Sequence, residues 1–388
     1  MELDFERVFK ISVYSLKLNR LVFYKRDLRW VTQVLIFYGI FLAIFVAILN
    51  SLIYYMKINQ LSDACDNGAM AIAFVGVTLM YSIVSKRQKD LIYLINAVNK
   101  DYNDSKNMSD TEQSYILDYI KKGKSVMHIW SLITVFVVLL IPSRVIVVMV
   151  SKGKFRLVDI LESFHPVILE KSSTELWCFN LELVIRVYYT IYANIMYIGF
   201  SPLGPIFMLH ACGQLEIVKE RIKSIFPEHN YDAEEAKQKL KDVVQRIQRI
   251  YDFLDSINRT CEVYYQIILN SISLLLPMIG YMLTKDFQSD KLVEYGVFLF
   301  GSFLMTFLPC YYSTLLLEKG EEVREAVYMS GWEGHMDSSA RGTLLVILTR
   351  ASRPMAVHTL FKTINLDALT DVCRTAYTIF NLLNTVWE

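Results

Sequence analysis

The sequence is poor in cysteine, balanced in charge and without the common enzymatic motifs. Its 388 residues include six cysteines, too few for a disulfide framework, and no two of them form a CxxC pair. The 40 basic and 39 acidic residues leave a net charge of +1, so no overall field attracts nucleic acid. GxxxxGK[ST], HExxH and GxSxG are absent, and none of the six histidines stands four residues from another. We expect no enzyme, no metal site and no cofactor.

Long uncharged runs dominate the rest of the chain. The composition is 54% hydrophobic and 20% charged, with a mean hydropathy of +0.32, a shift from soluble toward membrane proteins. A helix needs about 20 mostly apolar residues to cross the hydrocarbon layer. Because no run alternates polar and apolar residues, a transmembrane β-barrel is excluded and we expect an all-α membrane protein. Six runs meet or approach the required length: Val31–Met56, Asn67–Ser85, Ser125–Ser143, Val187–Leu215, Val263–Thr284 and Tyr295–Leu317.

A seventh candidate, Leu366–Trp387, carries charges and a polar stripe. At helical period Asp371, Thr375, Thr378 and Thr385 share one face, which Leu382 interrupts. Lipid cannot satisfy these polar groups, so a spanning helix of this kind must face water or protein. The two interpretations are an amphipathic helix on the membrane surface and a seventh spanning helix that lines an aqueous pore.

Basic residues beside the first run predict the orientation. Lys25, Arg26 and Arg29 precede it and only Lys57 follows closely, which predicts a cytoplasmic N-terminus. With seven spans the C-terminus is then outside, the reverse of a G-protein-coupled receptor. Cys65 and Cys178 both fall on the outer side, where they could form a disulfide, although spacing alone cannot establish it.

The segments between the runs divide the chain into four parts. We expect a cytoplasmic segment at 1–30, six spans at 31–317, cytoplasmic helices at 318–365, and the last helix at 366–388. Within the second part, residues 213–262 resemble a helix more than a loop, because Asp232–Leu254 has apolar residues at three- and four-residue spacing. This helix could continue into the fifth span. Its apolar face packs either against other projecting helices or back on its own subunit.

The C-terminal region resembles the signature of insect odorant receptors. The residues that carry the resemblance are Arg350, Arg353-Pro354-Met355, Phe361 and Tyr377-Thr378-Ile379-Phe380-Asn381-Leu382-Leu383. The seven spans and the cytoplasmic N-terminus agree with that family. Two positions depart from its pattern, His358 in place of a small residue and Thr370 in place of an aromatic one.

The resemblance implies a ligand-gated, non-selective cation channel in the plasma membrane of sensory neuron dendrites. Family members assemble as tetramers, with cytoplasmic helices that form a central anchor and a last helix that lines the pore. The chain lacks the co-receptor's longer insertion between the fourth and fifth spans, so it is similar to an odour-tuning subunit that pairs with co-receptor subunits in a heterotetramer. The expected partners are a small volatile ligand, membrane lipid and permeating cations. Gustatory receptors are the nearest alternative, and a G-protein-coupled receptor or a secondary transporter is more distant.

Two groups of site residues follow from the resemblance. The ligand is expected in the outer half of the bundle, where aromatic faces and methionine sulfur suit volatile molecules; the candidates are Phe74, Ile146, Met149, Tyr189, Tyr281, Tyr295 and Phe298. In the last helix, Leu382 from each subunit is expected to close the pore by dewetting, and Asn381 to rotate in when it opens. The pore candidates are Asp371, Thr375, Thr378, Asn381, Leu382 and Thr385. The alternative is that Leu382 packs against the sixth span and Leu383 faces the pore.

Overall fold

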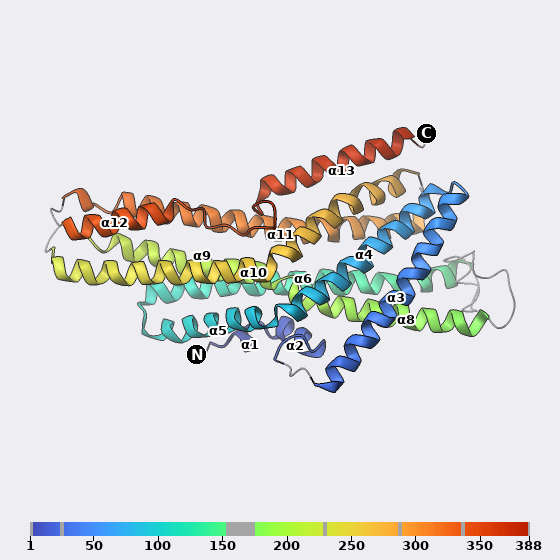
Figure 1. The fold of residues 1–388 in the computed structure, drawn as a ribbon, viewed down its shortest axis with the longest axis horizontal. Coiled ribbons are helices and arrows are strands. Elements are labelled where there is room, and N and C mark those ends of the chain that lie inside the picture. The colour runs from blue at the N-terminus through green and yellow to red at the C-terminus, as the bar shows by residue number, and fades with distance from the viewer. Residues whose placement is uncertain are drawn as a thin grey trace.

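A computed structural model describes residues 3–23, 27–152, 175–227, 231–285, 289–334 and 338–386. These residues are almost entirely helical, and the β-type pairing among them is one isolated bridge between His358 and Thr363. The helices, several of which lie along the long axis of the molecule (Figure 1), are α1 Phe5–Val8, α2 Lys10–Leu18, α3 Leu28–Lys57, α4 Leu61–Lys86, α5 Gln88–Asp104, η1 Ser105–Asn107, α6 Asp110–Lys152, α8 Glu175–Phe200, α9 Leu203–Lys223, α10 Ala233–Lys285, α11 Ser289–Tyr328, η2 Trp332–Gly334, α12 Ser338–Ala351 and α13 Leu366–Val386.

The predicted spans lie in these helices. Five segments of the described chain are long and apolar enough to cross a membrane: α3, α4, the stretch Tyr188–Lys223, α10 and α11. The third predicted run lies in α6 and the seventh in α13. The expected all-α membrane fold is therefore confirmed.

The fourth predicted span is wrong in its boundaries. Val187–Leu215 is not one helix, because α8 ends at Phe200 and α9 begins at Leu203. Pro202 and Pro205 lie where α9 starts, the place in a helix where a missing N–H costs least. In α9, 16 of the 21 residues are buried, so protein rather than lipid surrounds it. A charge-free run can belong to a buried core helix as well as to a span, and α9 is such a helix.

The prediction that the amphipathic segment continues into the fifth span is confirmed by α10. This helix has 53 residues and therefore extends about 80 Å, more than twice the thickness of the hydrocarbon layer. Its apolar face, which includes Val243 and Ile247, belongs to the same buried core as Val218 and Ile222 of α9. The face thus packs on its own chain. Similarly, α11 continues through residue 317 to Tyr328 without a break at the expected boundary.

One end of the molecule is a helical bundle, which we call the anchor bundle. It consists of α5, α9, α12 and the adjoining parts of α6, α10 and α11 (Figure 1). The N-terminal segment packs against it: Phe5 and Phe9 are buried, and the Phe5 ring stacks on Phe207 of α9 with centroids 5.7 Å apart. The N-terminal residues therefore contribute to the core instead of forming a separate unit.

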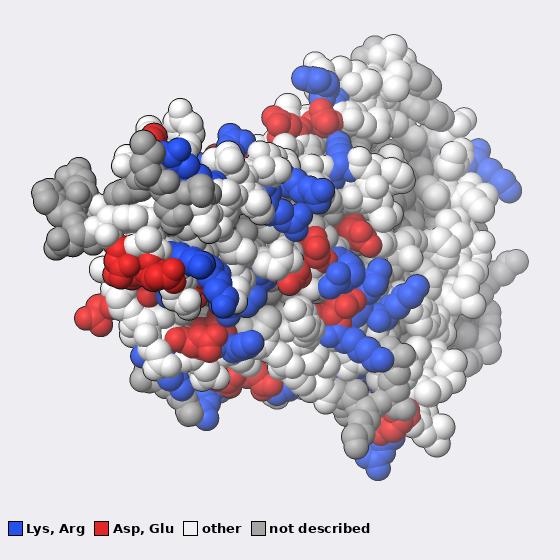
Figure 2. All heavy atoms as spheres, turned by 60° about the vertical axis from the view of Figure 1, so that its left-hand side comes forward, with Lys and Arg blue, Asp and Glu red and all other residues white. Residues whose placement is uncertain are grey.

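Ion pairs hold the helices of the anchor bundle together. Lys219 and Lys319 bridge the carboxylates of Glu216 and Glu322, which joins α9 to α11 at N–O distances of 2.5 to 2.8 Å. Charged side chains of both signs cover this end of the molecule (Figure 2). Such a surface suits water and not lipid.

A second ion-pair network joins α6, α9 and α10. Arg221 of α9 binds Glu112 of α6 at 2.5 Å and also pairs with Asp242 of α10. Burial by itself raises the pKa of Glu112, but the hydrogen bonds and charge of Arg221 outweigh burial and hold that pKa below its ordinary value. Glu112 also accepts a hydrogen bond from the Ser109 backbone N–H at the start of α6, so one carboxylate caps this helix and joins it to α9.

Candidate functional site

The last helix, α13, has one packed face and one exposed face. Its first turn is capped by Asn365, whose side-chain oxygen accepts a hydrogen bond from the Ala368 backbone N–H at 2.9 Å. Ala368, Val372 and Ala376 are buried against the rest of the chain, mainly α10. In Figure 1, α13 lies along the upper edge of the molecule and α2 lies at the lower edge. The other face of the helix therefore has no cover within the described chain.

The exposed face of α13 carries all six pore candidates. Asp371, Thr375, Thr378, Asn381, Leu382 and Thr385 are each exposed. Asp371, Thr375, Thr378, Leu382 and Thr385 follow one another at intervals of four, three, four and three residues, and Asn381 lies beside this row. We call the five residues the seam. In packed helices this heptad spacing keeps one row of side chains facing a common axis. The three threonine hydroxyls donate to carbonyls four residues earlier at 2.8 to 3.0 Å, so each is satisfied without a partner outside the helix.

The structure separates the two leucines of α13. Leu382 is 58% exposed on the polar seam and is not packed against the sixth span of its own chain. Leu383 takes the inward position together with Phe380. The Phe380 ring lies over Gly280 of α10, where an added Cβ would meet a ring carbon at 3.4 Å. The close approach of α13 to α10 at this crossing thus fixes which leucine faces outward.

Phe380 and Leu383 contact a buried group that contains two ligand candidates. We call this group the inner cluster, because it lies beneath α13. It comprises Cys65, Ala69, Leu275, Ile279, Tyr281, Met282 and Tyr295, with Phe298 packed against it. It is built by α4, α10 and α11. Two ligand candidates, Tyr281 and Tyr295, therefore belong to a group against which Phe298 and the last helix both pack.

Two other ligand candidates, Phe74 and Tyr189, lie in a separate aromatic group. Their rings stack with centroids 4.5 Å apart, and the Tyr189 hydroxyl donates to the Phe74 carbonyl at 3.0 Å. The same hydroxyl lies 2.8 Å from the Thr78 hydroxyl. Phe37 stacks on Tyr189 and also contacts Tyr81 and Tyr192. We call Phe37, Phe74, Tyr81, Tyr189 and Tyr192 the Tyr189 cluster.

The sequence reasoning missed most of the Tyr189 cluster. Phe37, Tyr81 and Tyr192 look like ordinary residues of apolar runs, and only the packing of α3 against α4 and α8 brings them together. Their aromatic character was the available signal, but it did not separate them from the many other aromatic residues.

Three predicted residues fall outside the described side chains. Ile146 and Met149 lie in α6 and Cys178 in α8, where the structure describes only the helical backbone. Cys65 is a buried free cysteine in the inner cluster, so the structure contains no disulfide at this residue. Its thiol packs against apolar side chains of α10 instead.

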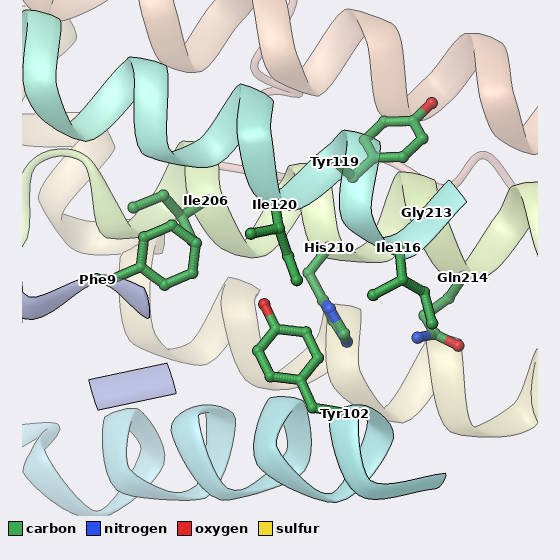
Figure 3. A pocket seen from close by; sticks show the side chains of 9 residues that line it. All are labelled: Phe9, Tyr102, Ile116, Tyr119, Ile120, Ile206, His210, Gly213 and Gln214. Carbon is green, nitrogen blue, oxygen red and sulfur yellow. The ribbon is translucent and has the colours of Figure 1, made fainter. Parts of the chain in front are cut away.

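Neither of two cavities in the described structure coincides with the ligand candidates. Figure 3 shows a cavity of about 10 Å³ in the anchor bundle, room for one water molecule, beside His210, whose Nε2 lies 2.9 Å from an Asp101 carboxylate oxygen. Its lining is Phe9, Tyr102, Ile116, Tyr119, Ile120, Ile206, His210, Gly213 and Gln214. An open groove of about 400 Å³ runs along α12 beside Leu345, Val346, Thr349, Arg350 and Arg353. Among the described residues, no three His, Cys, Asp or Glu side chains are grouped to hold a metal ion.

Comparison with known proteins identifies the family. Residues 60–377 match the model of the 7tm odorant receptor family. The chain is 23% identical over 221 residues to odorant receptor Or2 of Anopheles gambiae, covering 54% of this chain and 57% of that protein. It is 24% identical over 157 residues to odorant receptor 85c of Drosophila melanogaster, covering 40% of each. The matches thus span about half the length of these relatives.

Solved structures agree on the fold. The olfactory receptor OR5 of the insect Machilis hrabei, in complex with eugenol, superposes with a TM-score of 0.79 at 17% identity, covering 98% of both chains. The same receptor in a second structure gives a TM-score of 0.75 at 16% identity, covering 98% of this chain and 97% of that one. Because the family model covers most of the chain and the seven-helix fold is shared end to end, this protein belongs to the insect 7tm odorant receptor family, whose members are receptors and not enzymes.

Proposed function

We propose that the chain is an odour-tuning subunit of a ligand-gated, non-selective cation channel. A small volatile ligand binds among the spanning helices and opens a pore lined by α13. Support comes from the family and from the shared fold with a receptor solved with eugenol, a small aromatic molecule. In this proposal the protein lies in the plasma membrane of a sensory dendrite with its N-terminus and anchor bundle in the cytoplasm.

One observation carries the proposal: the inner cluster joins ligand candidates to the last helix. Tyr281 and Tyr295 pack in the same buried group as Phe380 and Leu383, while the seam residues point away from it. A ligand that displaces the tyrosine rings also changes the surface against which α13 packs. Because packed cores shift between discrete arrangements, a small local displacement can turn a whole helix.

The seam of α13 accounts for both conduction and closure. Its threonine hydroxyls and the Asp371 carboxylate offer oxygen atoms to partly hydrated cations. Leu382 is the apolar residue in the line, and a ring of such residues blocks ions by dewetting. Asn381, its neighbour by about 100° of rotation, replaces an apolar ring with an amide-lined one when the helix turns.

Exposed apolar residues on α12 and in the turn before α13 support assembly with other subunits. Phe361 is 84% exposed at the tip of the turn before α13, and Leu345 and Val346 of α12 are 59% and 66% exposed. Isolated apolar residues on a surface are ordinary, but these belong to α12 and to the turn before α13, and both helices lie along the upper edge of the molecule in Figure 1. We propose that they contact neighbouring subunits in a heterotetramer with the co-receptor.

The test compares two adjacent leucines in cells that also express a co-receptor subunit. Leu382→Ser removes the apolar constriction and should raise current in the absence of ligand or alter cation permeation. Leu383→Ser puts a hydroxyl into the inner cluster and should mainly lower surface expression. A panel of volatile alcohols, esters and phenols, eugenol among them, supplies the ligand-evoked current.

The two variants are matched in chemistry and differ by one residue of helix. If their effects were exchanged, the α13 seam would be rotated by about 100° from the position described here. If neither changed the current, α13 of this subunit would not line the gate. Current that is unaffected by alanine at Tyr281, Tyr295, Phe74 and Tyr189 would place the ligand outside both clusters.

A further inference from the structure

The turn that precedes α13 is fixed to the neighbouring helices. The Val357 backbone N–H donates to Ser313 of α11 at 3.3 Å, and the His358 N–H donates to Asn258 of α10 at 2.9 Å. The Leu366 N–H donates to the Thr314 hydroxyl of α11 at 3.1 Å. These bonds attach the residues on both sides of the turn, so its position relative to α10 and α11 is determined by the fold.

The turn itself is closed by Thr359. Its backbone N–H donates to the Lys362 carbonyl at 2.7 Å, and its hydroxyl accepts from the Lys362 N–H at 3.1 Å. The His358–Thr363 bridge completes the closure. The backbone of Lys362 is thereby held in a fixed place at the base of α13.

From this place Lys362 reaches the first residue of the seam. Its Nζ lies 3.3 Å from a carboxylate oxygen of Asp371, and the two side chains are 42% and 57% exposed. Asp371 is separated by a single helical turn from Thr375, the next residue of the seam. The pair therefore sits at the end of the seam beside the anchor bundle, in contact with solvent.

We propose that Lys362 sets the conductance of the pore by neutralising Asp371 at its inner mouth. This rests on the proposed function, since it requires that the seam lines the pore. An unpaired ring of carboxylates would concentrate cations at the cytoplasmic entrance, whereas a carboxylate paired with an ammonium group adds almost no net charge. A residue outside the pore helix thus sets the charge at the inner mouth of the pore.

The size of the effect follows from Coulomb's law. One unit charge about 8 Å from the path of a monovalent cation in water changes the local cation concentration roughly two- to threefold. The effect fades with salt, because the Debye length falls from about 30 Å at 0.01 M to about 3 Å at 1 M. Loss of the positive charge should therefore raise outward cation current at low internal salt, and loss of the negative charge should lower it.

The test uses excised inside-out patches from cells that express the chain with a co-receptor subunit. Lys362→Gln should raise the outward single-channel conductance roughly twofold at about 10 mM internal salt, Asp371→Asn should lower it by a similar factor, and the double variant should return to the wild-type value. Both single-variant differences should vanish at about 1 M salt. Exposed ion pairs contribute little to stability, so these variants should fold.

The matched control is the exposed pair of Lys122 and Asp118 on α6. Their N–O distance is 2.8 Å and their exposed fractions are 50% and 56%, close to those of the Lys362 pair. Lys122→Gln should leave the conductance unchanged. Equal conductance in wild type, Lys362→Gln and Asp371→Asn at low salt would overturn the inference, as would an equal response to Lys122→Gln.

A cysteine placed in the seam distinguishes failure of the inference from failure of the proposed function. Cys373→Ser first removes the exposed native thiol of α13, and Thr378→Cys then adds one to the seam. Block of this variant by a charged methanethiosulfonate reagent, without any charge effect at Lys362, would reject the inference alone. No block, or no current from either the odorant panel or Leu382→Ser, would reject the proposed function and the inference with it.

Discussion

The junction between the spanning helices and the anchor bundle depends on a glycine. Gly204 lies in the first turn of α9, and the Tyr265 side chain of α10 lies against its Cα. A Cβ at this position would overlap the Tyr265 hydroxyl oxygen and would also lie 3.1 Å from the ring carbon that bears it. Both positions are buried, so the Tyr265 side chain cannot turn into solvent to make room for a Cβ at residue 204.

The expected destabilisation by Gly204→Ala follows from two opposing effects. Overpacking in a buried site costs about 1–3 kcal/mol. Alanine in place of glycine favours the helix by about 1 kcal/mol, which offsets part of that cost. Because the overlap with the buried Tyr265 hydroxyl is severe, the upper half of the overpacking range applies, and we expect Gly204→Ala to lower the free energy of unfolding by about 1–2 kcal/mol.

Tyr265→Phe provides the rescue. The Tyr265 hydroxyl is buried and has no hydrogen-bond partner in the described structure, so its removal should itself stabilise the protein by about 1 kcal/mol. In the double variant the largest overlap disappears while the ring carbon remains close. We expect Tyr265→Phe to be the most stable of the four proteins and Gly204→Ala the least stable, with wild type and the double variant between them.

Thermal unfolding of the purified protein in detergent gives the ranking. Gly39→Ala is the control, since a Cβ at Gly39 in α3 meets no atom within 4 Å and should be neutral or slightly stabilising. A Gly204→Ala protein as stable as wild type would refute the contact. A Gly204→Ala defect that Tyr265→Phe did not reduce would show that another neighbour is responsible.

Three further predictions concern the ligand site, the anchor bundle and the topology. Tyr189→Ala should raise the half-maximal odorant concentration about 5- to 150-fold, and Tyr189→Phe, which keeps the stacked ring, much less; unchanged dose–response curves would exclude this ring as a contact. Glu112→Gln weakens the pair with Arg221 and should cost about 1–3 kcal/mol near pH 7. The pKa of Glu112 is lower in the folded than in the unfolded protein, so its contribution to stability is present above the unfolded pKa of about 4.3 and disappears as the pH falls through the folded pKa. In unfolding measurements across pH, the stabilities of wild type and Glu112→Gln should therefore converge in acid. Asn103-Asp104-Ser105 is a glycosylation sequon that the predicted topology places in the cytoplasm. A linker with a second sequon inserted after Lys57 should be modified in cells while Asn103 is not, as judged by glycosidase-sensitive gel shifts; a modified Asn103 would invert the topology.

The sequence determined the features that depend on a single segment. The length of an uncharged run decides whether a helix can cross the hydrocarbon, and the runs in α3, α4, α10 and α11 met this condition. The spacing of apolar residues along one helix decides which side is packed. For this reason the polar face of α13 followed from residue order, whereas the packing of Phe380 over Gly280 decided that Leu382 and not Leu383 faces outward.

Tertiary structure decided what depends on neighbours. The run Val187–Leu215 has the composition of a span, yet α9 is surrounded by α6, α10 and α11, and only those partners show that protein replaces lipid. The same dependence divides the ligand candidates into two clusters, because ring stacking brings Phe74 to Tyr189, whereas Tyr281 and Tyr295 pack near Phe380.

The pairing of Lys362 with Asp371 is the clearest example of a contact that tertiary structure decides. The two residues are nine positions apart, at no helical spacing, and their contact exists because the hydrogen-bonded turn at Thr359 directs Lys362 back along α13. Local sequence sets the period of a helix and the chemistry of its faces. Which face meets which partner depends on the packing of distant segments, a property of the whole chain that no single segment contains.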